Sequence, residues 1–109
     1  MKVETKGHTC VIKDNQGDLT GFLMKLTHEY KTFEKHNIVA DVSSCTNVSA
    51  KDLNAFLPLS KSHKKAKKSF VVVADVDFNS VSDKLVIVPT LQEAHDMIEM
   101  DEIERDLGF

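Results

Sequence analysis

The stretch FVVVAD, residues 70–75, decides which fold this sequence predicts. Its first five residues are all apolar, without the polar and apolar alternation of a half-exposed strand. Such runs are typical of strands buried in a parallel sheet. The run is also the longest apolar stretch in the chain, and it is too short to cross a bilayer. Residues 70–75 therefore predict a buried strand of a parallel sheet.

Four other short runs complete the predicted sheet. Residues 85–88 are as apolar as residues 70–75, and residues 38–42 are interrupted only by Asp41. Two β-rich runs at the N-terminus flank Gly7 and predict a hairpin. The four runs are residues 2–4, 9–13, 38–42 and 85–88.

Apolar side chains three and four positions apart predict three helical regions. Capping boxes mark the starts of the second and third regions, at Ser49 and Thr90. Pro58 lies inside the second pattern, so we expect a kink or two separate pieces there. The regions are residues 18–35, residues 49–57 with 59–68, and residues from 90 almost to the C-terminus.

The predicted elements follow the order β-β-α-β-α-β-β-α, which is typical of an α/β domain. We expect a mixed, mainly parallel sheet of four to five strands packed with about three helices. The chain has 109 residues and is 41% hydrophobic, enough for one core, so residues 1–109 should form a single domain. No apolar run of the signal-peptide kind occurs near the N-terminus. We therefore expect a soluble, cytoplasmic protein without membrane contact, in which Cys10 and Cys45 are free thiols.

The element order and several residues resemble the STAS family, the fold of anti-sigma-factor antagonists and of the cytoplasmic domains of sulfate transporters. The resemblance covers essentially the whole chain and includes IVADV, residues 38–42, where the family often has a VLDL-like strand. STAS antagonists usually carry an Asp-Ser-Ser-Gly-like signature, with one serine phosphorylated by a partner kinase. By that alignment Lys51 replaces the phospho-acceptor and Asp52 the glycine. Residues 76–84 also leave room for little more than one turn of the family's next helix.

A second resemblance is to short bacterial STAS-like proteins that accompany ribonuclease Z and sometimes carry its name. It rests on LPLSKSHKKAKKSFVVV, residues 57–73, and VPTLQEAHDMIEMDEIERDLGF, residues 88–109. Ribonuclease Z activity needs a clustered HxHxDH zinc motif, whereas the five histidines here are scattered singly. The resemblance thus implies an accessory of ribonuclease Z or of RNA processing, and we expect no enzyme activity, no metal and no cofactor.

The segment DVSSCTNVSAKDL places hydroxyl side chains between a predicted strand and helix, where α/β sheets tend to bind ligands. It has no glycine to let the backbone approach a phosphate, so Ser49 is interpreted first as a helix N-cap. The alternative is a regulatory phosphosite at Ser49 or Thr46. A nucleophilic Cys45 served by His63 or His95 is a weaker alternative, because no spacing forces them together.

Charge is segregated along the chain. Residues 49–68 hold six lysines and one acid, whereas residues 90–109 hold seven acids and one arginine. We expect a dipole that can steer a partner or favour weak self-association. The lysines at the end of the second helix are typical of a solvated helix end, and contact with RNA phosphates is the alternative. They are Lys61, Lys64, Lys65, Lys67 and Lys68.

The last predicted helix has two apolar stripes. The first ends where Asp101 and Glu102 occupy the next core positions. The second is rotated from it, and it either packs over a neighbouring helix or stays exposed, flanked by acids, as a docking element for another protein or a second copy. We predict a protein-binding surface here, with residues 100–109 forming an interaction tail that can be deleted without unfolding the domain. Its residues are Met97, Met100, Ile103, Glu104, Leu107 and Phe109.

These features together predict a non-catalytic, STAS-like interaction module, present as a monomer or weak homodimer, whose partner by resemblance is ribonuclease Z. Two alternatives remain open. A phosphorylation-switched anti-sigma-factor antagonist would act with a regulatory kinase at Ser49 or Thr46. An RNA-binding accessory would use the lysine-rich helix end, with binding that weakens steeply as salt is added.

Overall fold

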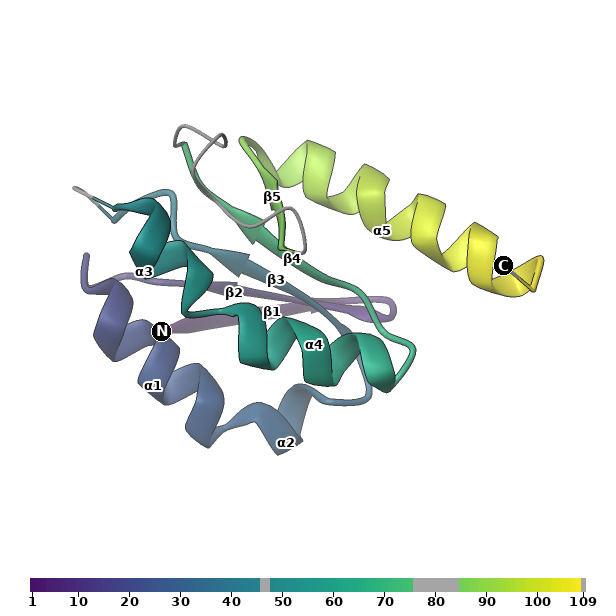
Figure 1. Ribbon diagram of the computed structural model, residues 1–109, viewed down its shortest axis with the longest axis horizontal. Helices are drawn as coiled ribbons and strands as arrows, with labels where there is room; N and C mark the ends of the chain where they lie inside the picture. Colours follow the sequence, from purple (N-terminus) through teal and green to yellow (C-terminus); the bar gives the residue numbers. More distant parts are fainter. Residues whose placement is uncertain (46–47, 76–84, 109) are drawn as a thin grey trace.

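A five-stranded sheet forms the centre of the protein in the computed structural model, which describes residues 1–45, 48–75 and 85–108 (Figure 1). The strands are β1 (Lys2–Lys6), β2 (Thr9–Lys13), β3 (Asn37–Asp41), β4 (Phe70–Val73) and β5 (Val86–Val88). They lie side by side in chain order, with β1 antiparallel to β2 and all other pairs parallel. The predicted α/β class with a mixed, mainly parallel sheet is confirmed.

Helices cover both faces of this sheet (Figure 1). They are α1 (Leu19–His28), α2 (Tyr30–Phe33), α3 (Ala50–Asn54), α4 (Leu57–Lys65) and α5 (Leu91–Asp106). The first four belong to the crossovers from β2 to β3 and from β3 to β4. Right-handed crossovers that step the same way along a sheet fall on one side of it, so α1 to α4 share one face and α5 covers the other. None of the described helices is long and apolar enough to cross a membrane.

The prediction of one continuous helix over residues 18–35 is wrong, because the chain forms two helices that meet at Glu29. Near the end of α1, the Thr27 hydroxyl donates to the carbonyl four residues earlier at 2.8 Å, a bond that bends helices. Beyond the break, Phe33 is buried in the core and Tyr30 packs partly buried against it.

The predicted division into two helices is confirmed, but it lies between α3 and α4 at residues 55–56 and not at Pro58. Pro58 lies in the first turn of α4, where a missing N–H removes no helical hydrogen bond. Ser49 forms both bonds of its predicted capping box. At Thr90 the side chain accepts the backbone N–H three residues later, which is one half of the predicted box. The predicted connection over residues 76–84 lies outside the described residues.

Two apolar clusters lie on the two faces of the sheet. In the larger cluster, beneath α1 to α4, the ring centroids of Phe22 and Phe56 are 6.3 Å apart, and those of Phe56 and Phe70 are 6.2 Å apart. The smaller cluster joins strand valines to Ala94 and Ile98 of α5. Strand β4 contributes to both clusters and is buried along its whole length, as its apolar sequence predicts.

His63 is a core residue of α4 and is fully buried. Its Nε2 donates to the carbonyl of His36 at 2.6 Å, and its Nδ1 accepts from the hydroxyl of Tyr30 at 2.7 Å. Burial lowers the pKa of His63 below 6.5, and the positive charges of Lys68 and Arg105 lower it further, against the opposing effect of the bond to His36. The folded protein therefore favours the neutral imidazole with one fixed tautomer.

The buried His63 should make the fold sensitive to mild acid. Below about pH 6.5 the unfolded chain binds a proton at this residue that the folded protein resists, so the free energy of unfolding should fall as the pH is lowered. In urea titrations, His63→Gln should be less stable than the wild type but should lose less stability between about pH 7.5 and about pH 5.5. The exposed His28, changed to Gln, is the matched control. An unchanged pH dependence in His63→Gln would contradict the assignment.

Candidate functional site

The N-terminal half of α5 packs on the sheet through the first predicted stripe. Ala94 and Ile98 are buried against valines of β3, β4 and β5. Leu91 and Met97 are partly buried beside them. The first stripe is therefore confirmed as core, and it fixes which side of α5 faces the sheet.

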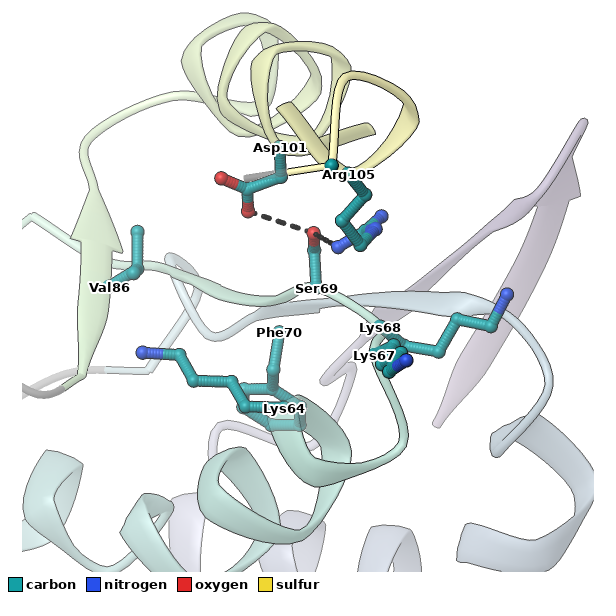
Figure 2. Close-up of a pocket in the computed structure, with 9 residues that line it drawn as sticks. Lys64, Lys67, Lys68, Ser69, Phe70, Val86, Asp101 and Arg105 are labelled. Atoms are coloured by element: carbon teal, nitrogen blue, oxygen red, sulfur yellow. Dashed lines mark hydrogen bonds between the residues drawn. The ribbon is translucent and has the colours of Figure 1, made fainter. Parts of the chain in front are cut away.

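Polar contacts replace apolar packing in the C-terminal half of α5. Ser69, just before β4, donates through its hydroxyl to Asp101 at 2.8 Å and accepts from Arg105 at 3.1 Å (Figure 2). The side-chain amide of Asn37, the first residue of β3, donates to Glu102. Its oxygen accepts from the Ser69 backbone at 2.9 Å and from Arg105 at 3.4 Å. The acids that interrupt the apolar stripe are thus the groups that attach α5 to the ends of two strands.

The predicted tail, residues 100–109, contains the residues that make this attachment, and its deletion stays a prediction. Asn37 and Ser69 are 2% and 3% exposed, so they depend on partners within the protein. Three of those partners, Asp101, Glu102 and Arg105, lie in the segment. Deleting the segment would remove these three partners and expose Asn37 and Ser69 to water.

The second apolar stripe of α5 faces away from the sheet. Met100, Ile103 and Leu107 are 58%, 53% and 66% exposed, so the alternative in which they pack over a neighbouring helix is wrong. Glu99, Glu104 and Asp106 are exposed beside them. Of the other predicted binding residues, Met97 is half-buried against the core and Phe109 lies outside the described residues. We call Met100, Ile103 and Leu107 the outer row of α5.

The predicted lysine cluster lies at the end of α4 and in the connection to β4. Four of its members are exposed and Lys68 is half-buried. Three of the lysines, Lys64, Lys67 and Lys68, line a pocket of about 410 Å³ together with Arg105 of α5. The lysine-rich and acidic segments therefore meet at one end of the molecule. Arg105, the only arginine in the chain, was missed by sequence reasoning because seven acids surround it in the sequence.

Ser49, one of the two predicted phosphosites, caps the N-terminus of α3. Ser49 accepts the N–H of Asp52 at 3.2 Å, and the Asp52 carboxylate accepts the N–H of Ser49 at 3.1 Å. The hydroxyl is exposed, but a phosphate there would stand beside the Asp52 carboxylate. Thr46 lies outside the described residues.

The structure does not bring Cys45 and His63 together. The Cys45 thiol follows the C-terminal end of β3 and donates to the Asp14 carboxylate at 3.0 Å, whereas His63 is bonded near the opposite end of that strand. Burial raises the pKa of Cys45 to about 12, with contributions from the Asp14 hydrogen bond and from neighbouring carboxylates. His95 belongs to α5, which covers the other face of the sheet. A Cys–His nucleophile is therefore not supported, and the described Asp, Glu, His and Cys side chains form no group that could hold a metal.

Asn37 should carry much of the attachment between α5 and the sheet. Replacing it with Ala removes the partner of Glu102 and leaves the Ser69 N–H unpaired, so the free energy of unfolding should fall by about 1–3 kcal/mol in urea titrations. Asn15 is exposed, and Asn15→Ala is the matched control. If Asn37→Ala and Asn15→Ala have the same free energy of unfolding, the buried amide of Asn37 contributes no more to stability than the exposed amide of Asn15.

Cys45 should react slowly with thiol reagents as long as Asp14 is intact. In a Cys10→Ala background, Asp14→Asn should lower the Cys45 pKa and raise the rate of alkylation by iodoacetamide at about pH 8, because the thiolate is the reactive form. The thiolate fraction grows about tenfold for each pH unit by which that pKa falls. The pH profile of the rate gives the pKa directly. If Cys45 reacts at the rate of an ordinary thiol while Asp14 is still present, the hydrogen bond between Cys45 and Asp14 is contradicted.

Neither a scan of protein-family models nor a search of curated proteins finds a match to this chain.

Proposed function

We propose that this protein is a non-catalytic, STAS-like interaction module that binds another protein through the outer row of α5. The observation that carries the proposal is the exposure of Met100, Ile103 and Leu107, each more than half accessible, along one side of a helix that is fixed by its opposite side. The element order, with a hairpin followed by alternating helices and parallel strands, supports the STAS-like part of the proposal.

The spacing of the outer row suits recognition of a helix by a groove. Positions 100, 103 and 107 follow the i, i+3, i+7 pattern by which helices insert apolar side chains into a partner. Single exposed apolar residues are ordinary, but an aligned row is not needed for solubility or folding. Since the polar contacts of Asp101 and Glu102 hold the helix in place, the row is presented in a fixed orientation.

The charges beside the outer row define the chemistry of the partner. Glu99, Glu104 and Asp106 are exposed next to it, so the partner should offer an apolar groove rimmed by lysines or arginines. The resemblance to proteins that accompany ribonuclease Z makes that enzyme the first partner to test. A second copy of this chain, with its own lysine-rich segment, is the competing occupant.

The phospho-switch and RNA-binding alternatives have less support. Ser49 already serves as a helix cap beside Asp52. Within the described residues every phenylalanine is buried and Tyr30 is half-buried, so no exposed phenylalanine or tyrosine ring accompanies the lysines for base stacking. Neither alternative uses the outer row.

The proposal predicts that polar substitution of the outer row abolishes binding without unfolding. Met100→Gln combined with Ile103→Gln should weaken the affinity for purified ribonuclease Z from the same cells at least about tenfold, because truncated anchor residues usually cost more than about 1–2 kcal/mol. The matched control is Met24→Gln, since Met24 is 69% exposed on α1. Calorimetry measures the affinity, and urea unfolding shows that both variants keep their stability.

Three outcomes decide between the occupants. The proposal is supported if the double variant loses binding and the Met24→Gln control keeps it. Equal binding by the double variant and the control excludes the outer row as the contact. If ribonuclease Z does not bind, and sedimentation shows a wild-type dimer that the double variant loses, the occupant is a second copy of the chain.

A further inference from the structure

The pocket between α4 and α5 is unusually basic for an acidic protein. It lies where the end of α4, the start of β4 and the last turns of α5 meet (Figure 2). Among the described residues, Lys64, Lys67, Lys68 and Arg105 line it together with one carboxylate, Asp101. The lining thus has a formal charge of +3 in a chain whose formal net charge is -3. Its volume of about 410 Å³ is in the range of small-molecule sites.

Arg105 is held in this pocket by neutral groups. Its guanidinium donates to the Ser69 hydroxyl at 3.1 Å and to the Asn37 amide oxygen at 3.4 Å. Asp101 is linked to it through the Ser69 hydroxyl, and within the described ranges Arg105 forms no direct ion pair. Asp101 and Glu102 reach Arg105 only through Ser69 and Asn37, so an anion in the pocket would give the guanidinium a direct charged partner.

Lys67 adds an independent sign of function, because its backbone adopts a conformation that favours glycine. Its φ is 62°, and no other non-glycine residue in the described ranges has a positive φ. The N–H of Lys67 donates to the Lys64 carbonyl at 2.9 Å and the N–H of Lys68 to the His63 carbonyl at 3.1 Å. This is the Schellman ending of a helix, in which glycine is usual at the position of Lys67. Folding alone favours glycine there, so the lysine side chain points to a role in binding.

We propose that this pocket binds the phosphate group of a small organic phosphate. Arg105 offers a planar pair of donors for phosphate oxygens, and the lysines add point charges around it. Val86, which is partly buried, supplies an apolar contact for the rest of the ligand. A compact phosphate suits the site better than a nucleic-acid strand, because no exposed phenylalanine or tyrosine among the described residues offers a stacking surface.

Calorimetry of the full chain at low salt tests the proposal with inorganic pyrophosphate, ADP and a 12-nucleotide RNA as probes. We expect one ADP or pyrophosphate per chain, with tighter binding of ADP if the apolar lining contributes. Lys67→Gly should raise the melting temperature, since glycine relieves the unfavourable φ, and yet weaken the binding about tenfold. Arg105→Lys keeps the charge but loses the paired donors, so it should also weaken binding. Lys25→Gln, on exposed α1 surface, is the control for loss of one positive charge.

Three other results would contradict the proposed role of the pocket or of Lys67. Lys67→Gly with a raised melting temperature and unchanged affinity would show that the lysine has no role in the pocket. Absence of pyrophosphate and ADP binding at millimolar concentration would overturn the proposal. RNA binding without binding of either small phosphate would instead identify the lysines as a nucleic-acid surface. None of these measurements involves the outer row, so they are independent of the partner proposed for it.

Discussion

The buried side chain of Asn37 is the contact on which the arrangement of α5 depends. It stands at the start of β3, accepts the backbone N–H of Ser69 before β4, and donates to Glu102 of α5. An amide in the interior must satisfy both its oxygen and its nitrogen, because each unpaired group costs about 1–3 kcal/mol. This requirement selects one rotation and one axial position of α5 relative to the sheet. The apolar contacts of Ala94 and Ile98 fix which side of the helix faces the sheet, and the Asn37 bond to Glu102 adds a contact near its C-terminal end.

Two surfaces follow from that single rotation. Because Asp101, Glu102 and Arg105 point toward the strands, Met100, Ile103 and Leu107 must point away from them. The same rotation carries the guanidinium of Arg105 to the end of α4, where the lysines are. The outer row and the basic pocket are therefore opposite sides of the same last turns of α5.

The sequence was sufficient to predict the elements and insufficient to predict how they meet. The apolar run of β4 and the proline in the second helical region are local signals, and they predicted a buried strand and a divided helix, although the division lies at residues 55–56. The break at Glu29 was missed because the apolar spacing continues through it, from Leu26 to Tyr30 and Phe33. Asp101 and Glu102 were recognised as interruptions of a stripe, but their partners lie 32 and 65 positions away along the chain. The left-handed backbone of Lys67 has no signal at all in a run of lysines.

The closeness of the two surfaces has a thermodynamic consequence. An anion bound by Arg105 would add a partner to the polar contacts that hold the end of α5, and it would reduce the fraying to which last turns are prone. A protein that binds the outer row needs those turns to be helical. If the anion has already ordered them, the protein would lose less conformational entropy on binding. The two events are then coupled, and each must favour the other by the same factor, because the coupling free energy is shared. If the proposed ligand and the proposed partner both bind, the last turns of α5, which Asn37 attaches to the sheet, are where the ligand would influence the capture of the partner.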